Sequence, residues 1–223
     1  SGSFSISGMC TGCRVTVARP AAVVRSSACG CRLSYSTASG MPPVRAAERS
    51  GNPALALAAK MLRDWDYRYT LTAQTPVLFE AAMKRVIDFC RRYGVAKHGL
   101  QIAHAGRKGP TTPPAQGGKP IRPDEEGGWI AEAPSAVPFA ADWPVPEAMS
   151  KARLQSLLGE FVAAVGRAER IGYDLVEVHA GHGYLVHQFL SPLSNTRTDE
   201  YGGSLENRMR FPLELFAAMR AAW

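Results

Sequence analysis

The chain has 223 residues, of which 46% are hydrophobic and 20% are charged. This composition is typical of a globular protein and excludes a fibrous or wholly disordered one. No apolar run approaches the roughly 18 residues that a membrane-spanning helix needs, and no signal peptide opens the sequence. We therefore expect a cytoplasmic protein that has no membrane partner.

The net charge of +7 lies mostly in the first 50 residues, which contain six arginines and one acid. The remaining 173 residues contain 20 basic and 18 acidic side chains and are nearly neutral. A nucleic-acid surface needs a coherent basic face with aromatic or groove-reading residues beside it. The arginines here are scattered among Ser, Ala and Gly, so nucleic-acid binding is not the favoured interpretation.

Residues 1–74 differ from the rest of the chain and are expected to be poorly structured, because they show no persistent apolar period. Two alternatives stay open for this segment. Its four cysteines form one C-x-x-C pair and one C-x-C pair and could be drawn as a zinc site: Cys10, Cys13, Cys29 and Cys31. The Arg-, Ala-, Gly- and Ser-rich composition is also what GC-rich DNA yields when it is translated in a wrong frame.

Regular elements are expected from Thr75 onward, and residues 75–223 are expected to form one partial barrel domain. Thr75 and Pro76 predict the start of a helix that ends at Gly94, with an apolar stripe from Leu78 to Cys90. A short buried strand is expected over 99–105, followed by a turn over 106–109. Residues 110–148 hold nine of the 16 prolines and are expected to form a lid-like loop.

The C-terminal part continues the alternation of strands and helices. Ser150 is expected to cap a helix that Gly172 ends, and a strand is expected over Leu175–Val178. A last helix is expected after Ser204, with one apolar side made of Leu205, Met209, Leu213, Phe216 and Met219. This order predicts an α/β fold with a parallel sheet or a (β/α) barrel.

Three side chains that suit catalysis follow the strand Leu175–Val178 within six residues, namely His179, His182 and Tyr184. The carboxyl ends of barrel strands carry the reactive groups of barrel enzymes. Two imidazole N–H groups aimed at one point suit an oxygen that gains negative charge, and a phenol could deliver a proton nearby. The spacing lacks the helical i, i+4 pattern of a zinc site, so no metal is expected.

Two further groups of polar residues stand out. Gln101 lies inside an apolar strand with His104 close behind, and a Gln amide can satisfy the imide edge of a planar heterocycle. The polar residues between Asn195 and Arg208 are interpreted as mainly structural, cross-linking a loop and capping the last helix.

Three segments together resemble the old yellow enzyme family of FMN-dependent NAD(P)H:ene reductases, in particular its bacterial NADPH dehydrogenases and xenobiotic reductases. These segments are LQIAHAGRKG, APSAVPF (Ala133–Phe139) and GYDLVEVHAGHGYLVHQFLSPLSNTRTDEYGGSLENRMRF. The resemblance runs from about Pro76 to Trp223. It implies an eight-stranded (β/α) barrel, of which about the first half, with strands three and four recognisable, lies in this sequence.

The resemblance also implies roles for individual residues. Gln101 would bind the pyrimidine edge of FMN, and His179 would contact the flavin as well as the substrate. His179 and His182 would hold the carbonyl or nitro oxygen of the substrate, and Tyr184 would be the proton donor. The implied reaction reduces activated alkenes with NADPH or NADH, and the implied partner is a small enone or nitro compound.

The sequence departs from that family at both ends. The first strand and its flavin-contacting turn are not recognisable in residues 1–75, and the second half of the barrel is not among the 223 residues. Two interpretations therefore remain beside the enzyme: a truncated, non-catalytic remnant of the family, and a Cys/Arg-rich zinc or nucleic-acid module at the N-terminus. Association into a homo-oligomer also stays open.

Overall fold

The computed structural model describes residues 4–6, 15–17, 22–25, 47–63, 75–113 and 116–223. Side chains are described from Ala47 onward. The cysteines of the alternative zinc site, from Cys10 to Cys31, lie outside the described residues. Within the described part of the chain, no group of three or more His, Cys, Asp or Glu side chains could hold a metal ion.

A five-stranded sheet forms the centre of the molecule, in the order β1-β2-β3-β4-β7. The first two pairings are antiparallel, whereas β3 with β4 and β4 with β7 are parallel. The strands are β1 (Phe4–Ile6), β2 (Val15–Val17), β3 (Ala22–Arg25), β4 (Gly99–Ile102) and β7 (Leu175–Val178). The three parallel strands, with helices between them, form part of the expected (β/α) barrel.

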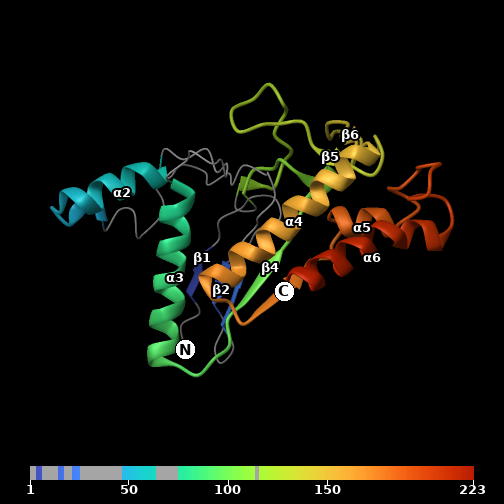
Figure 1. Ribbon diagram of the computed structural model, residues 1–223. Helices are drawn as coiled ribbons and strands as arrows, with labels where there is room; N and C mark the ends of the chain where they lie inside the picture. The colour runs from blue at the N-terminus through green and yellow to red at the C-terminus, as the bar shows by residue number, and fades with distance from the viewer. Residues whose placement is uncertain (1–3, 7–14, 18–21, 26–46, 64–74, 114–115) are drawn as a thin grey trace.

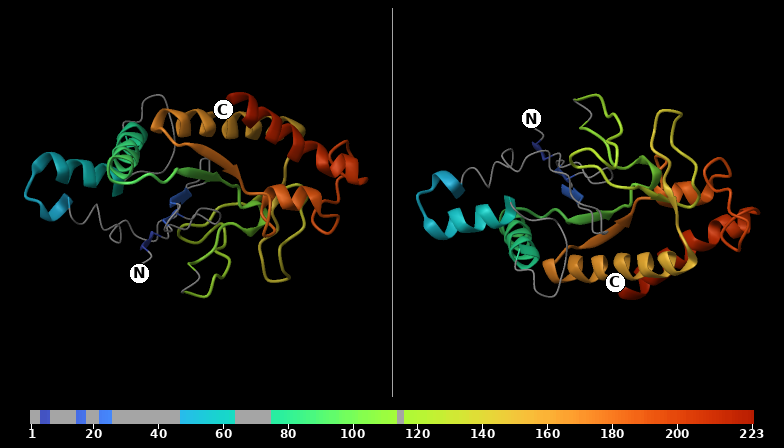
Figure 2. Two further views of the ribbon diagram at one scale, coloured as in Figure 1. Left: turned by 90° about the horizontal axis from the view of Figure 1, so that it is seen from below. Right: turned by 90° about the horizontal axis from the view of Figure 1, so that it is seen from above.

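The helices are α2 (Pro53–Arg63), α3 (Thr75–Tyr93), α4 (Lys151–Ile171), α5 (Leu185–Leu190) and α6 (Leu205–Ala222). Figure 2 shows α4 and α6 side by side along the same face of β4 and β7, as helices flank the outside of a barrel. Figure 1 shows α3 at the opposite end of α4 from the loops over β5 and β6. Short elements complete the fold: η2 (Gly106–Lys108), β5 (Glu132–Ala133) and β6 (Glu147–Ala148).

The ends of α4 agree with the sequence signals. The Ser150 side chain accepts a hydrogen bond from the backbone N–H of Arg153, which satisfies one of the unpaired donors of the first turn. Gly172 ends the helix with φ of 97°, a left-handed conformation that glycine adopts without a steric penalty. The expected helix after Thr75 and the strand Leu175–Val178 are also confirmed. The strand that begins at Gly99 ends at Ile102, earlier than Ala105.

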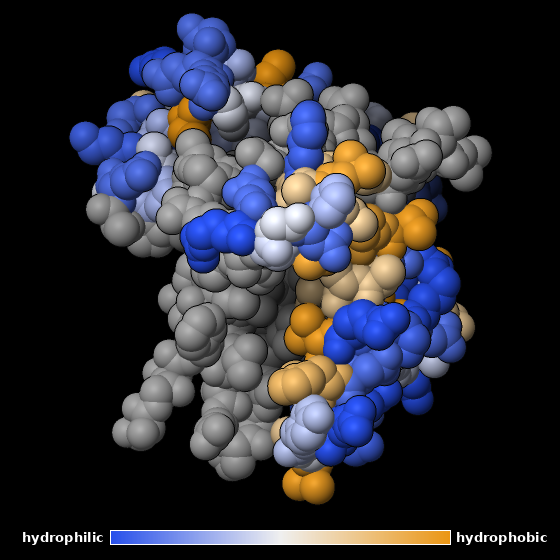
Figure 3. Space-filling model, turned by 90° about the vertical axis from the view of Figure 1, so that its left-hand side faces the viewer, coloured by the Kyte–Doolittle hydropathy of each residue, from blue (hydrophilic) through white to orange (hydrophobic). Residues whose placement is uncertain are grey.

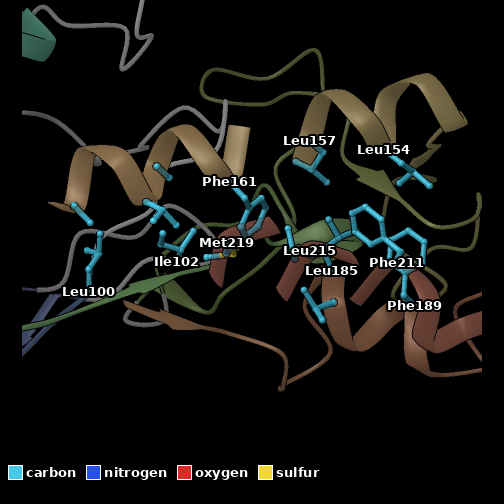
Figure 4. Close-up of a cluster of buried hydrophobic side chains, with 14 of the residues drawn as sticks. Leu100, Ile102, Leu154, Leu157, Phe161, Leu185, Phe189, Phe211, Leu215 and Met219 are labelled. Carbon is cyan, nitrogen blue, oxygen red and sulfur yellow. The ribbon is translucent and has the colours of Figure 1, made fainter. Parts of the chain in front are cut away.

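The hydrophobic core lies between the sheet and the helices that cover its outer face (Figure 4). Leu100 and Ile102 of β4 point toward α4, since alternate residues of a strand face opposite sides. Buried side chains of α4, α5 and α6 fill the rest, including Leu154, Leu157, Phe161, Leu185, Phe189, Phe211, Leu215 and Met219. The apolar stripe expected on α4 is therefore the core face of that helix.

The apolar side expected for α6 is wrong in most of its members. Leu205, Leu213 and Phe216 are 60%, 56% and 59% exposed, and Met209 is also exposed. Only Met219 of the expected set is buried, together with Phe211 and Leu215. The helix is apolar on two sides, and the described residues pack against only one of them.

Helix α3 likewise leaves most of its predicted apolar residues partly or largely exposed. Of its expected stripe only Ile87 is fully buried, while Val86 is 47% exposed and Phe89 on the same side is 64% exposed. Figure 3 shows the face that carries α2 and α3, with hydrophobic side chains at the surface beside strongly hydrophilic ones. Part of each flanking helix therefore presents apolar surface that no described residue covers.

Two segments contain more regular structure than the sequence indicated. Helix α2 lies in residues 1–74, where order was not expected before Thr75, although most of that segment lies outside the described residues. The loop 110–148 contains the parallel pair β5–β6 and an isolated bridge between Thr111 and Pro120. Among the described residues, no helix combines the length and the apolar character that crossing a membrane requires.

The packing predicts different costs for two phenylalanines of α6. Phe211→Ala should lower the free energy of unfolding by about 3–5 kcal/mol, because the ring is fully buried and packs 4.5 Å, centroid to centroid, from Phe189. Phe216→Ala, on the exposed side, should change it by roughly 0.5 kcal/mol. Urea unfolding followed by circular dichroism measures both, and equal effects would contradict the assigned core face.

Candidate active site

The pairing of β4 with β7 places Gln101 opposite Glu177 on the inner face of the sheet. The Gln101 amide donates from Nε2 to Oε1 of Glu177 at 2.7 Å, although Gln101 is buried and Glu177 is exposed. Two residues earlier Gly99 lies opposite Leu175, and a Cβ on Gly99 would come within 2.5 Å of Leu175 Cδ1. The lack of a side chain at Gly99 therefore lets Leu175 lie across the strand beside Gln101.

His179 follows β7 directly and continues its pairing, since its backbone N–H donates to the carbonyl of Ile102 at 2.9 Å. The chain then turns through Gly181, and His182 adopts φ of 55°. A positive φ is uncommon for a residue with a side chain, and such strain often accompanies functional sites. The turn brings the two imidazole rings to 5.0 Å between centroids.

One nitrogen of the His182 ring lies close to one nitrogen of the His179 ring. Nδ1 of His182 lies 3.2 Å from Nε2 of His179, so one ring donates to the other and the tautomers decide which. An oxygen placed beside both nitrogens could accept from each if both carried hydrogen. The arrangement expected from the sequence, two donors aimed at one oxygen, is therefore compatible with this geometry.

Tyr184 lies next to this pair. Its ring is 5.1 Å from the ring of His179, at an interplanar angle of 75°. It is the N-cap residue of α5, but its side chain makes no capping hydrogen bond. The structure thus brings His179, His182 and Tyr184 together at the carboxyl end of β7. Gln101 lies on the neighbouring strand, joined to Glu177 two residues before His179.

Gln188 of α5 joins the loop that follows β4 to the loop that follows β7. Its Nε2 donates to the carbonyl of Ala105 at 3.1 Å and to that of Gly183 at 2.7 Å. Its Oε1 accepts from the backbone N–H of Arg107 at 3.1 Å. The side chain is only 1% exposed, so each of these bonds satisfies a group that water cannot reach.

The close packing around Gln188 also explains why a glycine occupies position 106. A Cβ at Gly106 would lie 2.2 Å from Oε1 of Gln188, and Gly106 has φ of 59°. A larger residue there would displace the amide that links the two loops. The sequence analysis did not identify Gln188, although a Gln among Leu185, Val186 and Phe189 was a signal that could have found it.

A pair of cations lies on the 3₁₀ turn η2. Arg107 donates to the carbonyls of Val137 and Pro138, which ties the loop 110–148 to the end of β4. Lys108 donates to the carbonyl of His182 and lies over the rings of Phe139 and Tyr184. The sequence analysis identified the turn but gave neither side chain a role.

His104 is buried, and its Nδ1 accepts from the backbone N–H of Gly106 at 2.9 Å. Burial lowers its pKa from the ordinary 6.5 to about 4; the charges of Glu132 and Glu160 oppose this shift, and the charge of Arg153 adds to it. The ring is therefore neutral at pH 7. It shapes the loop after β4 and does not point to a catalytic role.

The polar segment from Asn195 to Arg208 is structural, as expected. The Asn195 amide donates to the carbonyls of Phe189 and Tyr201, and Arg197 pairs with Asp199. Arg197 also donates to the carbonyls of Pro134 and Met149. Ser204 caps α6 by accepting from the N–H of Asn207. These bonds hold the segment after α5 against the loop that precedes α4.

Comparison with known proteins agrees with this architecture. Residues 82–223 match the family described as NADH:flavin oxidoreductase / NADH oxidase family. The chain belongs to this family. An NADH:flavin oxidoreductase of Gibberella zeae is 46% identical over 141 residues, which are 62% of this chain and 34% of that protein. An NADPH dehydrogenase of Bacillus cytotoxicus is 40% identical over 142 residues, which are 63% of this chain and 36% of that protein.

Two similar solved structures support the fold. Morphinone reductase superposes with a TM-score of 0.52 and 32% identity, over 64% of this chain and 39% of that one. Histamine dehydrogenase from Rhizobium sp. 4-9 gives a TM-score of 0.52 and 34% identity, over 64% of this chain and 20% of that one. The resemblance to old yellow enzymes is thereby confirmed. The chain spans about a third of the length of the curated relatives it matches.

The buried His104 predicts a loss of stability in mild acid. Between pH 6.5 and about 4 this ring takes up a proton in the unfolded chain but stays neutral in the folded chain. The free energy of unfolding therefore falls as the pH falls. The loss should reach about 3 kcal/mol near pH 4. His104→Asn, which keeps an acceptor for the Gly106 N–H, should flatten the pH dependence of urea unfolding over this range. An unchanged slope would show that the ring titrates alike in both states.

The Gln188 amide predicts a large effect from a nearly isosteric change. Gln188→Glu replaces a donor by a carboxylate that faces two carbonyl oxygens, so unfolding should become easier by about 3 kcal/mol. The backbone N–H of Arg107 should also exchange with deuterium faster, because its loop loses its anchor. The exposed Gln116→Glu serves as the matched control. Equal stability and equal exchange rates in the two variants would contradict the role of Gln188 in joining the two loops.

Proposed function

We propose that this chain carries the substrate side of an FMN-dependent NAD(P)H oxidoreductase that reduces the C=C bond of α,β-unsaturated carbonyl or nitro compounds. The observation that carries the proposal is the convergence of His182 Nδ1 and His179 Nε2 at 3.2 Å, with Tyr184 beside them. Among the solved relatives is morphinone reductase in complex with tetrahydroNAD, which supports a nicotinamide coenzyme.

The residues on the inner face suit a flavin. A Gln amide offers two N–H donors and one acceptor oxygen, and the bond to Glu177 uses one of the donors. This bond orients the Gln101 amide, so its oxygen and nitrogen are not interchangeable. FMN, when bound, would take a hydride from the nicotinamide and pass it to the alkene.

The other residues would act on the substrate. His179 and His182 would donate hydrogen bonds to its carbonyl or nitro oxygen and so stabilise the negative charge that develops there. This requires hydrogen on Nε2 of His179 and on Nδ1 of His182 together, so binding of the oxygen would replace the direct contact between the rings. Tyr184 would supply the proton to the carbon next to the polarised group. NADPH and NADH both remain compatible with these residues.

The experiment that tests this function combines FMN binding with one conservative variant. The purified chain should quench FMN fluorescence on titration, and the loaded protein should oxidise NADPH in the presence of 2-cyclohexenone. Tyr184→Phe should slow cyclohexenone reduction by roughly 100-fold, while reduction of the flavin by NADPH under anaerobic conditions stays unchanged. The split arises because a proton donor is needed only when the alkene is reduced.

Tyr93→Phe, at an exposed position on α3, is the control and should behave like the unchanged chain. Failure to bind FMN would contradict the enzyme and support a non-catalytic remnant of the family. Binding of FMN with an unaffected Tyr184→Phe variant would keep the oxidoreductase but remove the role of the phenol.

A further inference from the structure

Lys108 joins three segments at the rim of the candidate site. Its Nζ donates to the backbone carbonyl of His182 at 2.9 Å. The same nitrogen lies 4.8 Å from the ring centroid of Phe139 and 5.2 Å from that of Tyr184. The ammonium therefore lies against two aromatic rings, one from the loop 110–148 and one from the loop after β7, at distances typical of cation–π contacts.

The side chain of Lys108 passes close to the backbone of Gly183. Gly183 has φ of 72°, and a Cβ at this position would lie 3.5 Å from Cδ and 4.0 Å from Nζ of Lys108. The stem of Lys108 thus runs along Gly183 to reach the carbonyl of His182. The bond restrains that peptide at the residue whose backbone conformation is strained.

Partial burial makes this contact stronger than an ordinary surface contact. Burial, with a further contribution from Arg107, lowers the pKa of Lys108, which shows that its ammonium is partly withdrawn from water. Interactions of an ion with a carbonyl and with ring faces strengthen as water is removed. Arg107 cannot take over this role, because its guanidinium is bound to the carbonyls of Val137 and Pro138.

We propose that Lys108 is a positioning residue that fixes the His182 backbone and the Tyr184 ring relative to each other and to Phe139. Through the first contact it holds the turn that aims the imidazole of His182 at His179. Through the second it holds the phenol beside the same pair. The ring of Phe139 also contacts the ammonium, so the aromatic part of the loop 110–148 takes part in the alignment.

The first test uses the protein alone and does not depend on flavin binding. Lys108→Met keeps the length of the side chain and removes its charge, whereas Lys119→Met removes a charge from an exposed position in the same connection. In NMR spectra, the carbonyl ¹³C signal of His182 and the ring signals of Tyr184 and Phe139 should shift in Lys108→Met and not in Lys119→Met. Lys108→Arg should restore most of the shifts. Unchanged signals in Lys108→Met would overturn the proposal.

The second test measures the catalytic consequence and rests on the function proposed above. In the FMN-loaded protein, Lys108→Met should lower kcat/KM for cyclohexenone by roughly tenfold, because misplaced groups lose alignment with the substrate. The dissociation constant of FMN, the rate of flavin reduction by NADPH and the melting temperature should match those of Lys119→Met. A uniform loss of all of them would indicate a merely structural role and overturn the proposal.

The two tests can contradict the two proposals independently of each other. If no variant binds FMN, the proposed function fails while the NMR comparison still decides whether Lys108 positions His182 and Tyr184. If FMN binds and cyclohexenone reduction is unaffected by Lys108→Met, the function stands and the positioning role is rejected.

Discussion

The parallel pairing of β4 with β7 is the constraint on which the candidate site depends. Its register sets Gln101 opposite Glu177 and leaves His179 as the next residue beyond the end of β7. A slip of β7 by one residue relative to β4 would turn Glu177 toward the helices and bring Val176 to the inner face. The buried apolar side chains on the outer face therefore fix which side chains lie on the inner face, because any other register would expose apolar groups and cost free energy of folding.

The register alone does not bring the rim loops together, because both leave the sheet at its carboxyl end and could diverge there. Gln188 prevents this with a neutral, fully buried amide that contacts both loops. Gly106 makes that contact sterically feasible. The neutral His104 shapes the same loop through the Gly106 N–H, so a single short segment carries two buried polar anchors. Buried polar groups of this kind specify one arrangement because every alternative leaves them unsatisfied.

The sequence was sufficient to predict the elements with local signals. Ser150 and Gly172 bound α4, Ser204 caps α6, and the run Leu175–Val178 is β7. The grouping of His179, His182 and Tyr184 could also be predicted, because all three follow one strand within six residues.

Other features could not be predicted from local signals. The face of α6 that enters the core depends on which partners are near, and Leu213 and Leu215 are equally apolar in sequence. Gln188 and Lys108 donate hydrogen bonds to carbonyls far away in the sequence, at Ala105 and His182. Neither role could therefore be identified from residue spacing. The positive φ of His182 likewise follows from the turn between β7 and α5 and not from the residue type.

The two links between the rim loops differ in a way that bears on how the site responds to its surroundings. The Gln188 link is neutral and buried, so salt has little access to it. The Lys108 link is charged and lies nearer the solvent, where ions screen an ammonium and water competes for its hydrogen bonds. Rising ionic strength should therefore weaken the hold on His182 while the loops themselves stay joined. Since Phe139 contacts the ammonium, movement of the loop 110–148 would remove one of the contacts that hold Lys108 in place, which couples the aromatic loop to the alignment of His182 and Tyr184.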